Sequence, residues 1–232
     1  MKAMILAAGV GSRLRPLTEE KPKALIEVDG KPLLEHVLTR LLSAGVTEVI
    51  INVHHFAEQI VEFVRGRNAF GIRIEFSYED VLLETGGGLK KAGFFFDDGE
   101  PFFLHNVDVL SDIDLGKMVT AHRERQALAT LAVMRRQSSR YLIFDETDRL
   151  CGWKSTRTGE EIRARPPQGR TEALAFCGIH VISPALLARL DEQGPFSIIK
   201  SYLRLAAASA PVLAFRADGY HWRDVGKVEE FG

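Results

Sequence analysis

The first 125 residues alternate short apolar runs with stretches of helical periodicity, and this order limits the folds open to the chain. Lys2 to Ala7 is an apolar run that ends at Ala8-Gly9, which predicts a fully buried first strand. Apolar residues then recur at helical spacing from Leu33 to Leu42, and a β-branched strand is predicted over Glu48 to Val53. Strands that alternate with helices favour an α/β fold around a largely parallel sheet.

The second half of the chain has a different character. It predicts more strands with less helix between them, which would add antiparallel strands and a small substrate lobe to the sheet. The polar stretch from Lys154 to Glu172 predicts a mobile loop or hairpin. The remaining predicted elements are a helix around Ile60 to Val64, strands at Ile72–Phe76 and Phe102–His105, a helix at Leu115–His122, strands at Ala129–Met134, Tyr141–Phe144 and Ala173–Ile182, helices near Pro184–Leu190 and Ile198–Ala207, and a strand at Val212–Phe215.

Composition excludes several classes of protein. The chain has 232 residues, 46% of them hydrophobic and 26% charged, as expected for one globular domain. A net charge of −1 gives no electrostatic reason to expect nucleic acid or an anionic membrane as a partner. No apolar run approaches the roughly 18 residues of a membrane-spanning helix, and Cys151 and Cys177 are too few for a disulfide framework. These features favour the cytoplasm. As a separate expectation, the protein is a monomer or a homodimer.

A glycine-containing loop with many cations follows the first predicted strand. Gly9 and Gly11 let the backbone approach a phosphate closely, and the cations that follow suit a triphosphate. The dinucleotide fingerprint needs a third glycine where Leu14 stands, and the P-loop pattern fails because no Gly-Lys-Ser/Thr follows. The pattern alone leaves open a solvated basic turn. The cations are Arg13, Arg15, Lys21 and Lys23.

A second glycine-rich segment, Glu84-Thr85-Gly86-Gly87-Gly88, precedes an expected helix. Three consecutive glycines cost much conformational entropy, so a plain loop rarely needs them. They would allow a flat ligand surface to lie against the backbone. The alternative is a glycine turn that only initiates the helix.

Two aspartates lie at positions suited to a metal ion. Asp108 follows the predicted strand that ends at His105, and Asp224 lies in the segment His221-Trp222-Arg223-Asp224-Val225-Gly226. Mg²⁺ prefers one or two carboxylates together with substrate phosphates and water. Both residues could instead be ordinary loop carboxylates. The nearby Asp112 and Asp114 are interpreted as a turn residue and a helix N-cap.

The segment Leu6-Ala7-Ala8-Gly9-x-Gly11-x-Arg13-x-x-Pro16-Leu17-Thr18, followed by Pro22-Lys23, resembles the signature of the nucleotidyltransferases that make nucleotide sugars. The order of later segments extends this resemblance over nearly the whole chain. It implies a Rossmann-like three-layer sandwich with a mostly parallel central mixed sheet, the glycosyltransferase-A-like nucleotidyltransferase fold, and a small substrate lobe. It also implies a single domain over residues 1–232, with a nucleotide-binding half at about 1–125 and a sugar-phosphate-binding half at about 126–232.

The resemblance also implies roles for individual residues. Arg13 would steady the phosphates and the leaving pyrophosphate, Lys23 would contact phosphates, and the other nucleotide contacts would be Leu6, Ala8, Gly9, Gly11, Gly86 and Gly87. Mg²⁺ would be held by Asp108 and Asp224. The sugar phosphate would be held by Asn106, Gly152, Lys154, Glu172 and Gly178. One departure is Val107, where many relatives have glycine, so a side chain there would narrow the sugar pocket or shift the turn.

The implied reaction joins a sugar 1-phosphate to a nucleoside triphosphate and releases pyrophosphate. Within the family, the sequence looks most similar to bacterial muramate 1-phosphate uridylyltransferases, which favours UTP and N-acetylmuramate 1-phosphate as substrates. Mannose- and heptose-phosphate guanylyltransferases share much of the pattern and stay as alternatives. A catalytically inactive relative that binds nucleotide sugars would lack the metal or phosphate residues, whereas all four are present. A dinucleotide-binding oxidoreductase is disfavoured by the missing third glycine.

Overall fold

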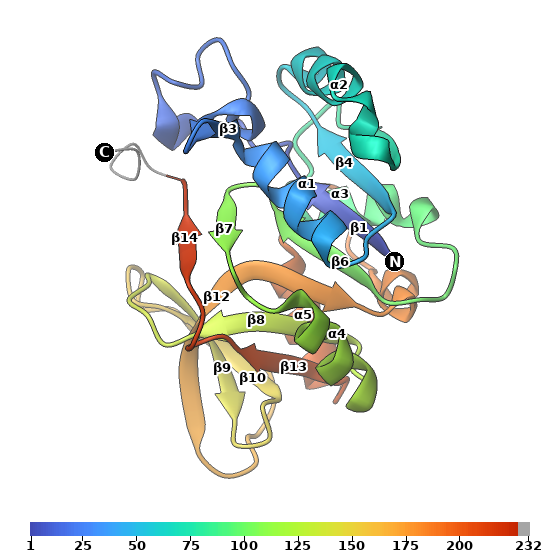
Figure 1. The fold of residues 1–232 in the computed structure, drawn as a ribbon. Helices are drawn as coiled ribbons and strands as arrows, with labels where there is room; N and C mark the ends of the chain where they lie inside the picture. Colours follow the sequence, from blue (N-terminus) through green and yellow to red (C-terminus); the bar gives the residue numbers. More distant parts are fainter. Residues whose placement is uncertain (227–232) are drawn as a thin grey trace.

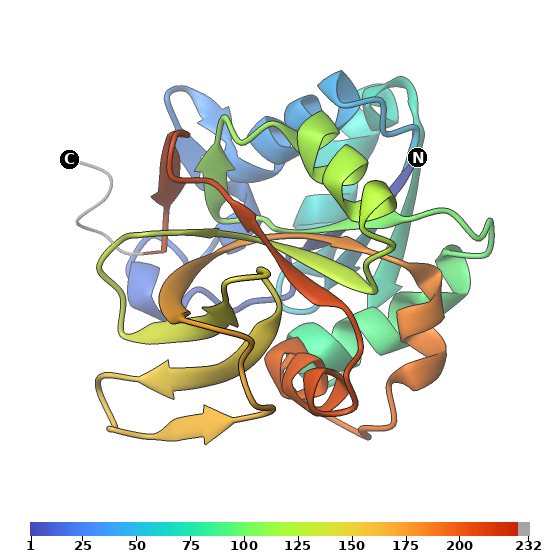
Figure 2. The same ribbon diagram turned by 90° about the horizontal axis from the view of Figure 1, so that it is seen from below.

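The computed structural model describes residues 1–226, so the end of the predicted domain at 232 lies outside the described residues. Helices lie on both faces of one large mixed sheet (Figures 1 and 2). The α-helices are α1 (Leu33–Ser43), α2 (Ala57–Gly66), α3 (Glu84–Lys91), α4 (Leu115–Glu124) and α5 (Ile198–Ala207). The strands of the large sheet are β1 (Lys2–Leu6), β4 (Glu48–Val53), β5 (Arg73–Tyr78), β6 (Phe102–Asn106), β8 (Ala129–Met134), β9 (Arg140–Asp145), β10 (Leu150–Ser155), β11 (Glu161–Arg163), β12 (Thr171–Ile182) and β13 (Val212–Arg216).

Two small two-stranded sheets lie beside the large one. They pair β2 (Glu27–Val28) with β3 (Lys31–Pro32), and β7 (Val109–Ser111) with β14 (Trp222–Asp224). The first strands of the large sheet, β6, β1, β4 and β5, are mutually parallel, and β12 runs antiparallel to β6. The predicted α/β architecture with a mostly parallel sheet in the first half is therefore confirmed.

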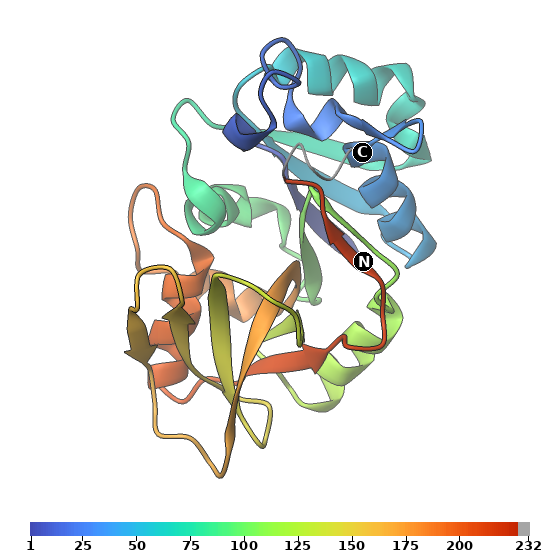
Figure 3. The same cartoon turned by 90° about the vertical axis from the view of Figure 1, so that its left-hand side faces the viewer.

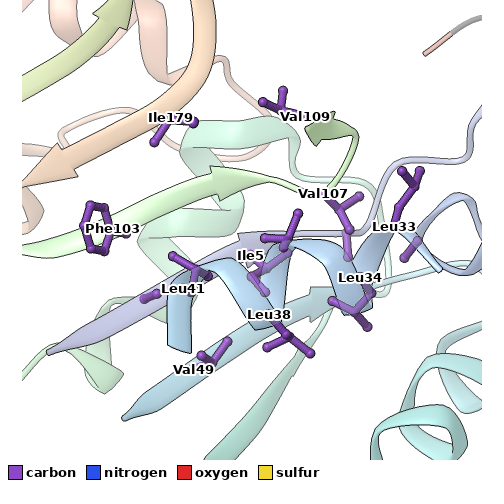
Figure 4. Close-up of a cluster of buried hydrophobic side chains, with 14 of the residues drawn as sticks. Ile5, Leu33, Leu34, Leu38, Leu41, Val49, Phe103, Val107, Val109 and Ile179 are labelled. Atoms are coloured by element: carbon purple, nitrogen blue, oxygen red, sulfur yellow. The ribbon is translucent and has the colours of Figure 1, made fainter. Parts of the chain in front are cut away.

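Side-chain alternation along the central strands builds two separate cores, one on each face of the sheet. In β1, Ala3 and Ile5 face one cluster and Met4 faces the other, and all three are fully buried. The first cluster packs under α1, α2 and α4; Figure 4 shows Leu34, Leu38 and other α1 side chains lying on this face. The second cluster packs under α3 and α5. These clusters define the three layers.

The long strand β12 joins the two halves of the molecule, because different parts of its length pair with different strands. Thr171 to Leu174 pairs with β9, and Ile179 to Ile182 pairs with β6. In the stretch between these two pairings, the register against β8 shifts between Phe176 and His180. The carboxyl end of β6 and the start of β9 therefore approach this stretch from opposite directions, and Figure 3 shows the two halves diverging here. The split opens space at the carboxyl end of the parallel strands.

The structure makes two local predictions more specific. The predicted helix near Pro184 is a 3₁₀ helix, η5 (Pro184–Arg189). The predicted loop or hairpin between Lys154 and Glu172 contains a hairpin, in which β11 pairs antiparallel with β10. The strands β2, β3, β7, β10 and β14 were not predicted. Within the described residues, no helix has the length and apolar character needed to cross a membrane.

The turn after β9 depends on a carboxylate buried inside the second half. Asp145 has a fully buried side chain that accepts hydrogen bonds from the amides of Thr147 and Gln168 and pairs with Arg165. Burial alone would raise the pKa of Asp145, but these donors, with the Thr147 hydroxyl and the Arg149 amide, outweigh it and hold the pKa well below its usual range.

We predict that Asp145→Ala lowers the free energy of unfolding by about 3 kcal/mol, because it leaves buried donors and the Arg165 cation without an acceptor. Since the native pKa is depressed, this stabilisation is present above the unfolded-state pKa of about 3.9 and is lost as the pH falls through the native value. Urea unfolding at pH 7.5 and at acid pH would measure both effects.

Glu161→Ala is the matched control, since within residues 1–226 Glu161 forms an ion pair only with exposed Arg163. It should change stability by less than about 0.5 kcal/mol. An Asp145 variant as stable as this control would contradict the assigned role.

Candidate active site

The loop after β1 lies along one side of a cavity of about 460 Å³ at the carboxyl end of the parallel strands. Leu6, Ala8 and Gly9 line this cavity, and their predicted contact with a nucleotide stays a prediction. No heavy atom lies within 4 Å of the position that a Cβ on Gly9 would take, so Gly9 leaves space open. Gly11 has a different role: its φ is +63°, and a Cβ there would lie 2.9 Å from Thr18 Cγ2. We conclude that Gly11 folds the loop and Gly9 faces the cavity.

Lys23 and Asp108 form an ion pair at the wall of the cavity. Lys23 begins the 3₁₀ helix η2 (Lys23–Leu25) and is buried, and Asp108 follows the end of β6. Both residues line the cavity. A buried ammonium needs a paired charge, and Asp108 supplies it.

Asp224 is brought next to Asp108 by strand pairing across 116 residues of sequence. β14 pairs antiparallel with β7 so that Asp224 lies opposite Val109, and the Val225 amide donates to the Asp108 carbonyl at 2.8 Å. Burial raises the pKa of Asp224, and the neighbouring Asp108 carboxylate raises it further. The two remote aspartates therefore form one acidic site.

Arg13 reaches the same acidic site from the glycine loop. A Cβ on Gly226 would lie 3.2 Å from Arg13 Nη2 and 2.7 Å from Asp224 Oδ1, so the two side chains flank this glycine. The positive charges of Lys23 and Arg13 both lower the pKa of Asp224. Arg13, Lys23, Asp108 and Asp224 thus converge, as the sequence predicted.

The acidic pair suits a magnesium ion with few protein ligands. Asp224 Oδ1 is buried and has no hydrogen-bond partner among the described residues, an arrangement that is costly unless a cation or another donor completes it. No group of three or more His, Cys, Asp or Glu side chains poised for a metal occurs in residues 1–226. Two carboxylates with substrate phosphates and water are the set that Mg²⁺ accepts, so the residues present fit this ion.

Two aromatic contacts hold β14 in place. Trp222 donates its indole N–H to the Cys177 carbonyl at 2.8 Å, and the Arg136 guanidinium lies 3.8 Å from the Trp222 ring centroid.

Val107 packs in the first core cluster near α1 (Figure 4), and only 4% of its surface is exposed. Val107 also lines the cavity, so its effect on the sugar pocket or on the turn stays a prediction.

The glycines of the second glycine-rich segment are inside a helix and not before it, because α3 begins at Glu84. A Cβ on Gly86 would lie 2.2 Å from the Phe196 ring, and a Cβ on Gly87 would lie 2.7 Å from the Gly194 carbonyl oxygen. Both glycines allow α3 to pack tightly against the segment that precedes α5. Contact of Gly86 and Gly87 with a nucleobase stays a prediction, whereas Glu84 and Thr85 line the cavity.

Two predicted sugar-phosphate residues lie together at the split in the sheet. Asn106 ends β6 and lines the cavity. Gly178 has a φ of +74°, and a Cβ there would lie 3.0 Å from Asn106 Nδ2 and 2.8 Å from Val109 Cγ2. Only glycine fits this bulge of β12 without moving Asn106.

The other predicted sugar-phosphate residues do not line this cavity. A Cβ on Gly152 would lie 2.4 Å from the Ile162 carbonyl oxygen, so Gly152 allows close pairing of β10 with β11. The Lys154 ammonium lies 5.6 Å from the Tyr141 ring centroid. Glu172 forms ion pairs with Arg135 and Arg216. Their contact with a sugar phosphate stays a prediction.

Sequence reasoning missed a buried polar network at the floor of the cavity. Asn52 accepts a hydrogen bond from the Ala7 amide at 2.8 Å and donates to Glu79 at 2.7 Å. Glu79 also accepts from the Leu83 amide at 2.8 Å and fixes the start of α3. A polar residue in the apolar run of β4 was an available signal for Asn52. Arg140 and Ser197 also line the cavity from the second half, and their positions depend on pairing that the local sequence does not encode.

Comparison with known proteins identifies similar chains. The family model described as Nucleotidyl transferase matches residues 2–232. The chain is 36% identical over 217 residues to the N-acetylmuramate alpha-1-phosphate uridylyltransferase of Caulobacter vibrioides, covering 88% of this chain and 84% of that protein. It is 30% identical over 236 residues to the mannose-1-phosphate guanylyltransferase catalytic subunit beta of Dictyostelium discoideum, covering 100% of this chain but only 62% of that protein.

A solved structure has the same fold. HddC from Yersinia pseudotuberculosis, complexed with GMP-PN, superposes with a TM-score of 0.76 at 20% identity, covering 99% of this chain and 96% of that chain. This likeness confirms the predicted nucleotidyltransferase architecture of a mixed, mostly parallel sheet between helices.

We predict that Gly86→Ala lowers the free energy of unfolding by about 1–3 kcal/mol, because the new methyl group overlaps the Phe196 ring. Gly9→Ala is the matched control, because no atom lies near the position of its new Cβ. This variant should have a free energy of unfolding within about 0.5 kcal/mol of wild type. Urea unfolding would compare them, and equal stability of the two variants would contradict the packing role of Gly86.

We also predict that Asp224→Asn raises the melting temperature in the absence of magnesium at pH 7.5. A raised native pKa means that the ionised carboxylate opposes folding, and that its cost grows as the pH rises through that pKa. The advantage of Asp224→Asn over wild type should therefore shrink towards pH 4. Differential scanning calorimetry would follow this trend, since a change of 1 kcal/mol in the free energy of unfolding shifts the melting temperature by about 2–4 °C. A variant that melts below wild type at pH 7.5 would contradict it.

Proposed function

This chain belongs to the nucleotidyl transferase family, and on that premise we propose that it joins a sugar 1-phosphate to a nucleoside triphosphate and releases pyrophosphate. The observation that carries the proposal is the convergence of Arg13, Lys23, Asp108 and Asp224 beside a cavity at the strand ends. The relatives named above are sugar-1-phosphate nucleotidyltransferases. A catalytically inactive relative is disfavoured because both cations and both carboxylates are in place.

The proposed reaction needs alignment and charge neutralisation more than it needs a base. The second pKa of a phosphate monoester is about 6, so the acceptor is already mostly a dianion at neutral pH. The barrier is repulsion between anions together with charge that develops on the departing pyrophosphate. An acceptor oxygen would attack the α-phosphorus in line, with no covalent enzyme intermediate.

The residues of this chain divide that work by position. Lys23 lines the cavity and would neutralise phosphate charge there, while Arg13, beside Asp224, would steady the leaving pyrophosphate. Asp108 and Asp224 would hold Mg²⁺, which when bound supplies positive charge against phosphate oxygens. Gly9 leaves the backbone open for a phosphate to approach.

For the substrates we propose UTP and N-acetylmuramate 1-phosphate. The Caulobacter relative supports this pair, because the match covers most of both chains. The guanylyltransferase relatives support GTP with mannose 1-phosphate as the second candidate, although this chain spans about 62% of their length. A pyrophosphate-release screen of four nucleoside triphosphates against a panel of sugar 1-phosphates, with and without Mg²⁺, would choose between them. Release with no pair in the presence of Mg²⁺ would refute the proposed activity.

We predict that Arg13→Ala and Asp108→Asn each lower kcat by roughly 10²–10³-fold, because each removes one preorganised charge from the reacting phosphates. Circular dichroism should show an unchanged fold. Arg123→Ala is a control for the removal of a surface cation. Arg123 is exposed on α4, and within residues 1–226 it forms an ion pair only with exposed Glu100. Turnover by either site variant at the rate of this control would refute the assigned roles.

A further inference from the structure

A second cavity, of about 340 Å³, adjoins the candidate active site on the side of the second half. Arg140 and Ser197 line both cavities, so the two spaces are neighbours. None of the residues predicted by resemblance to hold the sugar phosphate lines this second cavity. The residues of the second cavity therefore have no role in the predictions made so far for the sugar phosphate.

The position of this cavity follows from the split in the sheet. Arg140 is the first residue of β9, which approaches the β12 bulge from one side, and Asn106 ends β6 on the other. Ser197 is the N-cap residue of α5 and closes the space from the helical layer. A ligand whose phosphate lies near Lys23 and Asp108 could therefore extend past Asn106 and Arg140 into the second cavity.

The walls of the second cavity combine apolar rings with cations. Trp153 and Phe176 are half-buried and line it together with aliphatic side chains. Arg140 and Lys200 also line it, and neither is held in an ion pair with a described residue. Glu160 is the acidic residue in this wall, so the cations outnumber it. Such a surface suits a ligand group that is partly apolar and ends in an anion.

We propose that this second cavity binds a carboxylate-bearing substituent of the acceptor sugar, with Arg140 and Lys200 as the residues that determine this specificity. The proposal rests on the proposed function, since the substituent belongs to the sugar 1-phosphate. The apolar part of the substituent would pack on Trp153 and Phe176, and its carboxylate would pair with the two cations. A sugar without the substituent would leave both cations solvated and gain none of this binding energy.

Two acceptors that differ only in this group make the test direct. N-acetylmuramate 1-phosphate carries a lactyl ether with a carboxylate, and N-acetylglucosamine 1-phosphate is the same amino sugar without it. Isothermal titration calorimetry of the full chain with each acceptor gives the ratio of the two dissociation constants without any need for turnover. The variants are Arg140→Gln, Lys200→Gln and the conservative Arg140→Lys, with Arg189→Gln, an exposed cation outside both cavities, as the matched control.

The wild-type chain should bind the muramate derivative more tightly. Arg140→Gln and Lys200→Gln should each reduce this preference about tenfold, the effect of losing one charge-assisted hydrogen bond of about 1.4 kcal/mol. Arg140→Lys should restore part of it, and Arg189→Gln should keep the wild-type ratio. Equal binding of both acceptors by the wild type, or an unchanged ratio in both glutamine variants, would overturn the proposal.

The same samples separate this proposal from the proposed function. If no pyrophosphate is released but the wild type prefers the muramate derivative and the glutamine variants lose that preference, the enzymatic proposal fails and the binding site stands. If pyrophosphate is released with equal kcat/KM for both acceptors, the enzymatic proposal stands and the specificity proposal fails.

Discussion

The antiparallel pairing of β14 with β7 is the constraint on which the candidate site depends. It places Asp224 beside Asp108 and so adds a second half-buried carboxylate to the site. Like charges repel, so other contacts must hold the strands together. The Val225 amide bonds the Asp108 carbonyl, and Trp222 is fixed by the Cys177 carbonyl and Arg136. The backbone therefore imposes a proximity that the two carboxylates alone would oppose.

The space in front of this acidic pair comes from a second constraint, the division of β12 between two partners. β9 pairs with Thr171 to Leu174 and β6 pairs with Ile179 to Ile182, so the two pairings separate around the bulge at Gly178. Asn106, at the end of β6, and Arg140, at the start of β9, both line the main cavity. The first half supplies the phosphate loop and the acidic pair, and the second half supplies the far wall. Neither half encloses the cavity alone.

The sequence predicted the elements whose signal is local. Runs such as Lys2–Leu6 and the helical spacing of Leu33–Ser43 are buried and periodic, so their type could be assigned. The short strands β7, β11 and β14 are polar or brief and exist only through partners distant in sequence. The sequence predicts Gly86 and its neighbours before a helix, whereas they lie inside α3, where Gly86 packs against Phe196 although glycine has a low helix propensity. Glu79 could not be predicted because its partner Asn52 lies on β4, 27 residues earlier in the sequence.

The balance of charge within the site gives a physical reason for a cation requirement. The charges of Lys23 and Asp108 cancel, so this ion pair adds no net charge to the site. Asp224 Oδ1 is buried with no hydrogen-bond partner among the described residues, and its neighbours include Asp108. Arg13 lies near enough to lower the pKa of Asp224 but is itself exposed. In the proposed reaction, an anionic substrate would draw Lys23 and Arg13 towards its phosphates, and both carboxylates would lose compensation together. Asp108 and Asp224 would then hold Mg²⁺, whose positive charge would offset theirs, so metal affinity would depend on the presence of the nucleotide.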